Sequence, residues 1–141
     1  MRGLLKRLLE MRARNLAASG RYAQAVRWLR RAGDARPAGD LHLALGDSRG
    51  ALEAYREAGD WGPAGETALR LGNARQAAQF FMQASRIAQA CDALVKAGDR
   101  EAAIQLCLQR EGPAEAARLC ERLGRKSAAA EHYLEAGDAD S

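Results

Sequence analysis

The stretch EAYREAGDW, residues 53–61, contains a motif that recurs along the chain and decides its fold. Its triplet Ala-Gly-Asp also occurs at residues 32–34, 97–99 and 136–138. Glycine readily adopts the left-handed conformation that ends a helix, and aspartate is a preferred residue at a helix N-cap. We therefore predict that Gly59 ends one helix and that Asp60 starts the next.

The spacing of glycine and alanine shows that this motif belongs to a repeat of 13 residues. Glycine occurs at eight positions separated by 13 or 26 residues: Gly20, Gly33, Gly46, Gly59, Gly72, Gly98, Gly124 and Gly137. Alanine keeps the same interval at nine positions: Ala25, Ala38, Ala51, Ala64, Ala77, Ala90, Ala103, Ala116 and Ala129. Thirteen residues suit one helix of about three turns, roughly 15 Å long, with a tight turn after it. The predicted N-caps are the acidic or amide residues that follow these glycines: Asp34, Asp47, Asp60, Asn73 and Asp99.

Successive units differ in the size of the side chains on their predicted packing face. Alternate units tend to carry a larger side chain at the ninth position: Leu29, Tyr55, Phe81, Cys107 and Tyr133. The units between them carry two adjacent small residues: Ala38-Gly39, Ala64-Gly65, Ala90-Cys91 and Ala116-Ala117. Large side chains that face small ones let antiparallel helices approach closely, so the full repeat is a helix-turn-helix of 26 residues. Helices this short are marginal alone and depend on stacked neighbours for burial.

These patterns predict an all-α protein, an α-solenoid of about ten short antiparallel helices. We expect a single domain over residues 1–141, with an N-terminal capping helix at 1–20, repeating 13-residue helices at 21–137 and a tail at 138–141. Arg12 stands where the other units carry alanine, which is typical of a polar capping helix.

The segments SGRYAQAVRWLRRAG (19–33) and GDSRGALEAYREAGD (46–60) resemble tetratricopeptide repeats and the helical arms of coat-type and transport-type proteins. The chain departs from the tetratricopeptide pattern in two ways. Its period is 26 rather than about 34 residues, and it lacks the early Trp–Leu-Gly–Tyr block. The resemblance implies a tetratricopeptide-like superhelix that serves as a protein-binding scaffold, and it transfers no ligand site.

The chain carries no sequence signal for export or membrane insertion. No apolar run approaches the ~20 residues that span a bilayer. The start, MRGLLKRLLEMRAR, is interrupted by charges and has no long apolar segment of a secretory signal. Three cysteines without a CxxC pair suit a reducing compartment. We therefore expect a cytoplasmic protein, with alanine and arginine usage typical of bacteria.

The residues that could carry catalysis or bind a metal show no suitable spacing. These are Cys91, Cys107, Cys120, His42 and His132, and no pair has the spacing of zinc ligands. The glycines form no phosphate-binding GxxxxGK[ST] loop. We expect buried thiols in place of leucine or tyrosine, no metal, no cofactor and no enzymatic activity.

The main candidate site is a stripe of polar pairs on alternate units. The pairs, each four residues apart, are Arg27/Arg31, Glu53/Glu57, Gln79/Gln83, Gln105/Gln109 and Glu131/Glu135. Each pair shares one helix face, and the five pairs are expected to line up along one side of the solenoid. One interpretation is a solvated outer face, and the other is a recognition surface for a partner protein. Like charges four apart cost helix stability, which solubility alone does not require.

A second candidate is a basic patch, because residues 1–36 carry net charge +8 whereas residues 37–141 carry −4. Its members, beside Arg27 and Arg31 of the stripe, are Arg21, Trp28, Arg30 and Arg36. Basic side chains with an aromatic ring can hold phosphates and stack bases, which predicts a nucleic-acid or acidic-ligand binder as the alternative function. Equally, the tryptophan could pack at the edge of the solenoid under arginine stems, and the patch could attract an acidic protein.

The third candidate is the C-terminal end. Ala129, Tyr133 and Leu134 keep the spacing that packs against a following helix. Either the chain is a fragment of a longer solenoid or this end is an interface, for which self-association is the prediction. Our first functional hypothesis is a non-enzymatic scaffold or adaptor for protein–protein interaction.

Overall fold

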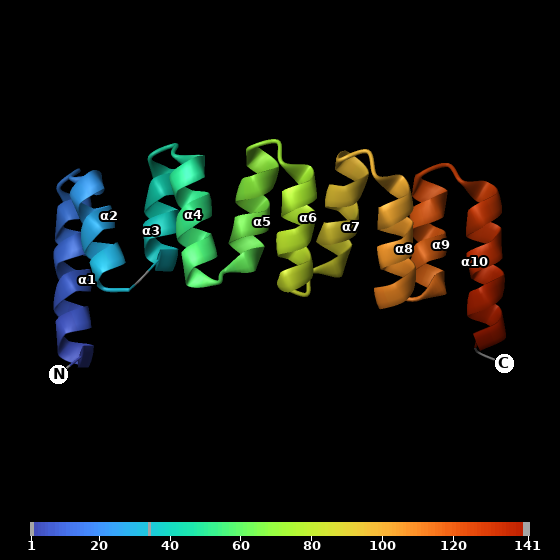
Figure 1. Cartoon of the computed structure of the whole chain (residues 1–141), viewed down its shortest axis with the longest axis horizontal. Coiled ribbons are helices and arrows are strands. Elements are labelled where there is room, and N and C mark those ends of the chain that lie inside the picture. Colours follow the sequence, from blue (N-terminus) through green and yellow to red (C-terminus); the bar gives the residue numbers. More distant parts are fainter. Residues whose placement is uncertain (1, 34, 140–141) are drawn as a thin grey trace. The chain divides into compact units, whose positions relative to one another are not determined.

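The structure is a computed structural model that describes residues 2–33 and 35–139, and within them it is all-α (Figure 1). The ten helices are α1 (Arg2–Ala18), α2 (Tyr22–Arg31), α3 (Ala35–Ala44), α4 (Ser48–Ala58), α5 (Trp61–Arg70), α6 (Ala74–Gln83), α7 (Ile87–Lys96), α8 (Arg100–Arg110), α9 (Pro113–Arg122) and α10 (Lys126–Ala139). These described ranges contain no strand, which confirms the predicted fold class at the level of secondary structure. None of the described helices is long and apolar enough to cross a membrane.

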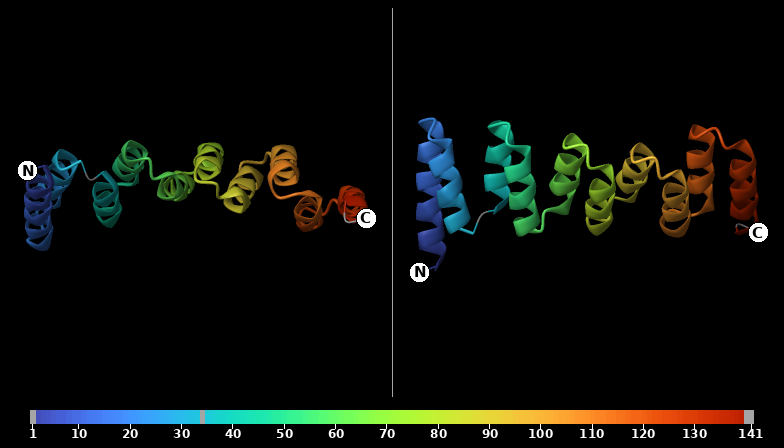
Figure 2. Two further views of the ribbon diagram at one scale, coloured as in Figure 1. Left: turned by 90° about the horizontal axis from the view of Figure 1, so that it is seen from below. Right: turned by 45° about the horizontal axis from the view of Figure 1, so that its top comes forward.

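The helices form two compact units, and the boundary lies between Gly72 and Asn73. Within each unit, every helix packs against its neighbours in sequence. These neighbours run in opposite directions (Figure 1). Helices α1–α5 of the first unit alternate between two layers, as do α6–α9 of the second (Figure 2). Each unit is thus an array of repeated helices. That all ten helices form a single solenoid and a single domain stays a prediction.

The turns between helices have the predicted backbone conformation. Gly59 has φ 69°, in the left-handed region, and the N–H of Asp60 donates to the carbonyl of Tyr55 at 2.9 Å. This hydrogen bond pairs a carbonyl that the last turn of α4 leaves without a helical partner. The glycine series has two gaps, at Ser85 and Glu111. Ser85 adopts the same conformation with φ 58°, whereas at the second gap the positive φ comes one residue later, at Gly112 with φ 99°. The turn therefore keeps its place in the repeat at Ser85 and shifts by one residue at Gly112.

Two of the predicted N-caps form the expected hydrogen bond. The side chain of Asp47 accepts from the N–H of Gly50 at 3.0 Å, and Asp99 accepts from Ala102 at 3.4 Å. Each bond satisfies an amide in the first turn of α4 or α8 that has no helical acceptor. The predicted cap at Asp34 lies outside the described residues.

Asp60 and Asn73 occupy N-cap positions, but their side chains do not cap the helices. The Oδ2 of Asp60 lies 2.9 Å from the Nε of Arg36, so an ion pair takes the place of the capping bond. The amide of Asn73 donates instead to the side chain of Gln76 at 3.3 Å. The identity of the residue thus predicted the start of the helix but not the partner of its side chain.

The prediction that Gly137 ends the last repeating helix is wrong, because α10 continues through it to Ala139. The other regularly spaced glycines have positive φ, and at those that lie within one unit a following helix packs back on the one before. Within the described residues no such helix follows α10. Glycine in a helix interior costs only about 1 kcal/mol, so nothing forces a turn there.

The core is built from the regularly spaced alanines, all nine of which are at most 3% exposed. Helices α3 and α4 approach each other closely, and a Cβ added at Gly39 would lie 2.7 Å from Cε1 of Tyr55. Tyr55 is buried, and its hydroxyl donates a hydrogen bond to Asp40. Burial and the neighbouring carboxylate of Asp40 both raise the pKa of Tyr55. At this contact a small residue therefore packs opposite a large one, as the sequence predicts.

Candidate functional site

The ten residues of the polar stripe all lie on even-numbered helices and are all exposed. In the first unit α2 and α4 each carry one pair, and in the second unit α6, α8 and α10 each carry one. A solvated face and a recognition surface both require exposure. Exposure therefore does not distinguish the two interpretations, and the surroundings of each pair must do so.

Three glutamines of the stripe line one groove in the second unit, with a volume of about 450 Å³. We call it the glutamine groove; Gln79 comes from α6, and Gln105 and Gln109 come from α8. The remaining lining residues are Arg75, Ala78, Met82, Leu94, Asp99, Ala102 and Leu106. Gln83, the other glutamine of the α6 pair, is not among them.

The glutamine groove combines apolar surface with uncharged hydrogen-bonding groups. Leu94 of α7 and Leu106 of α8 are partly buried, and Met82 is 37% exposed. Each carboxamide can donate and accept hydrogen bonds without bringing a net charge. Apolar walls with a few convergent polar groups are typical of binding pockets. Besides Arg75 and Asp99, the groove therefore offers a ligand both apolar contacts and uncharged hydrogen-bonding groups.

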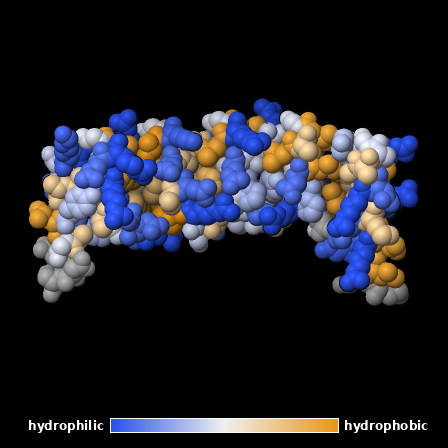
Figure 3. Space-filling view, turned by 180° about the vertical axis from the view of Figure 1, so that it is seen from behind, coloured by the Kyte–Doolittle hydropathy of each residue, from blue (hydrophilic) through white to orange (hydrophobic). Residues whose placement is uncertain are grey.

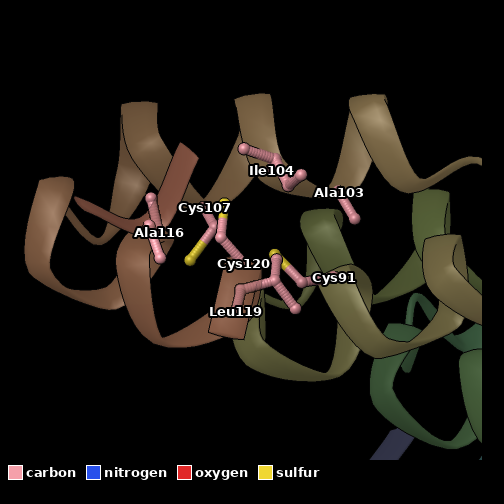
Figure 4. Close-up of a cluster of buried hydrophobic side chains, with 8 residues drawn as sticks. Cys91, Ala103, Ile104, Cys107, Ala116, Leu119 and Cys120 are labelled. Atoms are coloured by element: carbon pink, nitrogen blue, oxygen red, sulfur yellow. The ribbon is translucent and has the colours of Figure 1, made fainter. Parts of the chain in front are cut away.

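The three cysteines lie in the core of the second unit as free thiols, as the sequence predicts (Figure 4). Cys91 of α7, Cys107 of α8 and Cys120 of α9 belong to one buried cluster. Burial, followed by the neighbouring Cys107, raises the pKa of Cys91 to about 12. The described residues contain no group of three His, Cys, Asp or Glu side chains placed to hold a metal ion.

The buried thiols predict slow chemical labelling of the native protein. Because burial raises the pKa of all three thiols, they stay protonated near neutral pH and carry little reactive thiolate. We expect the disulfide reagent DTNB at pH 8 to label the folded chain slowly and the urea-unfolded chain at once. Rapid labelling of all three thiols in the native protein would contradict this packing.

The same pKa shifts give stability a pH dependence. Unfolded cysteine ionises near pH ~8.5, whereas the folded thiols ionise only at higher pH. Their contribution to stability is therefore fully present below about pH 8.5. It is lost as the pH rises toward the folded pKa. Urea unfolding between pH 8 and 11 is expected to show a smaller loss of stability in Cys91→Ala than in the wild type.

In the basic patch, the ring of Trp28 is covered by the protein's own arginines. The guanidinium carbons of Arg12 and Arg31 lie 5.1 and 5.6 Å from the ring centre, within cation–π range. Trp28 is also partly buried. This geometry matches the interpretation of a tryptophan at the edge of the repeat under arginine stems, and it leaves little of the ring for a base.

Two other arginines of the patch are engaged in ion pairs. Arg30 Nη2 lies 2.6 Å from Glu57 Oε1, and Arg36 pairs with Asp60. Arg21 is exposed. The two residues of the Arg30–Glu57 pair are 27 positions apart in the sequence, and those of the Arg36–Asp60 pair are 24 apart. Both separations are close to one 26-residue repeat. Opposite charges at that separation are the signal in the sequence that could have revealed them.

The C-terminal candidates are exposed, Tyr133 to 41% and Leu134 to 70%. The hydroxyl of Tyr133 donates to Glu121 of α9 at 3.1 Å. Leu29, Tyr55, Phe81 and Cys107, which occupy the corresponding place on the other even-numbered helices, are at most 9% exposed. The end of α10 therefore presents a side chain that the repeat elsewhere buries.

Comparison with known proteins assigns this chain to no family. No protein-family model matches the chain, and no curated protein compared with it matches either. The resemblance to tetratricopeptide repeats therefore stays a prediction.

Proposed function

We propose that this chain is a non-enzymatic protein-interaction module that holds a segment of a partner protein in the glutamine groove. The observation that carries the proposal is the grouping of Gln79, Gln105 and Gln109 around a hollow that Leu94 and Leu106 also line. A face needed only for solubility has no reason to place uncharged amides around partly exposed apolar side chains.

The groove favours a polypeptide over a nucleic acid. Nucleic-acid binding draws most of its affinity from cations that neutralise phosphates, and the groove offers Arg75 balanced by Asp99. The alternative function, a nucleic-acid or acidic-ligand binder at the N-terminal basic patch, has less support because Trp28 is covered and Arg30 and Arg36 are paired.

The rest of the chain would contribute to the same function. A tetratricopeptide-like solenoid would offer an extended surface, and a cytoplasmic scaffold or adaptor would use it to bring partners together. The stripe pairs Arg27/Arg31, Glu53/Glu57 and Glu131/Glu135 would then extend the recognition surface beyond the glutamine groove.

A random dodecapeptide library displayed on phage and selected against the full chain tests this function. We expect the selected peptides to bind Gln105→Ala/Gln109→Ala roughly 5- to 150-fold more weakly, because each of two lost hydrogen bonds costs about 0.5–1.5 kcal/mol. Gln83→Ala is the matched control: it removes a carboxamide of the stripe from α6 outside the groove. Its peptide affinity is expected to equal that of the wild type.

Several results would count against the groove. Failure to select any peptide contradicts the proposal, as does an equal loss of binding in the control variant. A single-stranded oligonucleotide that binds with steep salt dependence and is released by Arg30→Glu/Arg31→Glu would support the alternative function instead.

A further inference from the structure

The first helix exposes an apolar face that the sequence analysis did not single out. Leu4, Leu5, Leu8 and Met11 are 51–65% exposed. Their spacing places them on one side of α1, whereas Ala13 and Leu16 pack in the core with α2. Figure 3 shows hydrophobic side chains gathered on α1 near its N-terminal end. The spacing i, i+4 and i+7 of Leu4, Leu8 and Met11 could have revealed this face from the sequence.

Basic side chains border the apolar face of α1. Arg7 lies three residues after Leu4 and four before Met11, and Arg14 lies three after Met11, so both are neighbours of the face on the helix surface. Both arginines are exposed. A partner for α1 must therefore offer apolar contacts with a negatively charged border.

The last helix offers such a surface. On α10, Ala130, Tyr133 and Leu134 are exposed apolar side chains close together on the helix. Glu131 and Glu135 are exposed beside them. The face of α10 is thus apolar with an acidic border, complementary in charge to the face of α1.

Comparison with the interior repeats shows that the α10 face is one that a helix normally covers. Cys107 is the residue equivalent to Tyr133, one 26-residue repeat earlier. It lies in one buried cluster with Cys91 of α7 and Leu119 of α9, so helices on both sides cover it. Tyr133 has a contact with α9, through Glu121, but no further helix of the described chain lies on its other side.

We propose that the α1 face of one copy of this chain covers the α10 face of a second copy. The occupant is a second copy because the two faces on one molecule match in apolar character and oppose each other in charge. This proposal does not depend on the glutamine groove. The contact joins two different surfaces. An assembly of any size therefore keeps one free α1 face and one free α10 face, and it grows as an open chain unless these two faces meet and close a ring.

Analytical ultracentrifugation of the full chain over a concentration series tests the contact. The wild type is expected to form species larger than a dimer as concentration rises, and high salt is expected to weaken them. Leu8→Glu blocks the α1 face and Leu134→Glu blocks the α10 face; both side chains are at least half exposed, so the fold should tolerate the changes. Each variant alone is expected to be a monomer.

The mixture of these two variants is the decisive sample. Leu8→Glu keeps an intact α10 face and Leu134→Glu keeps an intact α1 face, so together they should form a one-to-one dimer that cannot grow. Leu45→Glu, at an exposed leucine outside both faces, is the control and should assemble as the wild type does. The double variant Arg7→Glu/Arg14→Glu is expected to have an association constant at least tenfold lower than the wild type. Mixing it with Glu131→Arg/Glu135→Arg places opposite charges across the contact again and should restore assembly.

Three results would overturn the proposal. A wild-type chain that stays monomeric at high concentration excludes the contact. Dimers formed by either single variant alone show that like faces pair instead. Binding of the monomeric wild type to phosphatidylserine vesicles, lost in Leu8→Glu, assigns the α1 face to an anionic membrane surface rather than to a second copy.

Discussion

Phe81→Ala is expected to lower the free energy of unfolding by about 3–5 kcal/mol, because removal of a large buried ring leaves a cavity that the helices cannot close. Phe81 is 1% exposed and belongs to α6, at the packing position where alternate units carry their larger side chains. Urea unfolding of the full chain, followed by circular dichroism, measures the loss.

Tyr133→Ala is the matched control for this substitution. It removes a ring from the equivalent position of α10, but Tyr133 is 41% exposed and buries much less surface. The expected loss is about 1 kcal/mol or less, since a half-exposed ring contributes little burial. Equal losses in Phe81→Ala and Tyr133→Ala would contradict the assignment of Phe81 to a buried position and of Tyr133 to an exposed one.

The second large effect is expected for Gly39→Ala in α3. The new Cβ would lie 2.7 Å from the buried ring of Tyr55, so α3 and α4 would have to move apart. Overpacking of a core costs about 1–3 kcal/mol, which outweighs the gain in helix propensity from alanine. Thermal unfolding of the variant should show a lower midpoint than that of the wild type.

Gly3→Ala makes the same chemical change where there is room for it. No atom lies within 4 Å of a Cβ built at Gly3, and the residue is an exposed part of α1. Alanine should therefore stabilise the helix, by less than the roughly 0.5–1 kcal/mol that applies in a helix interior because Gly3 lies in the first turn. The pair of variants is expected to shift stability in opposite directions. A stabilising Gly39→Ala would show that α3 and α4 do not approach each other as described.

The helix ends and the core could be predicted from the sequence because each is determined by the properties of single residues. A left-handed turn needs glycine or a tolerant residue, so Gly59 and the other regularly spaced glycines mark most helix ends. A tight helix contact needs a small side chain, so the regularly spaced alanines mark the core. Gly137 shows the limit: glycine permits a turn but does not require one, and α10 continues through it.

Side-chain partners were harder to predict, because they depend on distances between helices that a periodic pattern does not contain. Asp60 stands at the start of α5 as expected, yet it pairs with Arg36 of the preceding odd-numbered helix instead of capping. The sequence likewise predicted exposure of all ten stripe residues. It did not predict that Gln79, Gln105 and Gln109, but not Gln83, surround the groove that Leu94 lines.

Hydrogen–deuterium exchange of the full chain, with and without a peptide selected from the dodecapeptide library, tests the binding role of the glutamine groove most directly. The proposed function predicts slower exchange on peptide binding in α6 and α8, at residues 74–83 and 100–110. Protection confined to α1 and α2, or spread evenly over the even-numbered helices, would contradict a binding site in this groove.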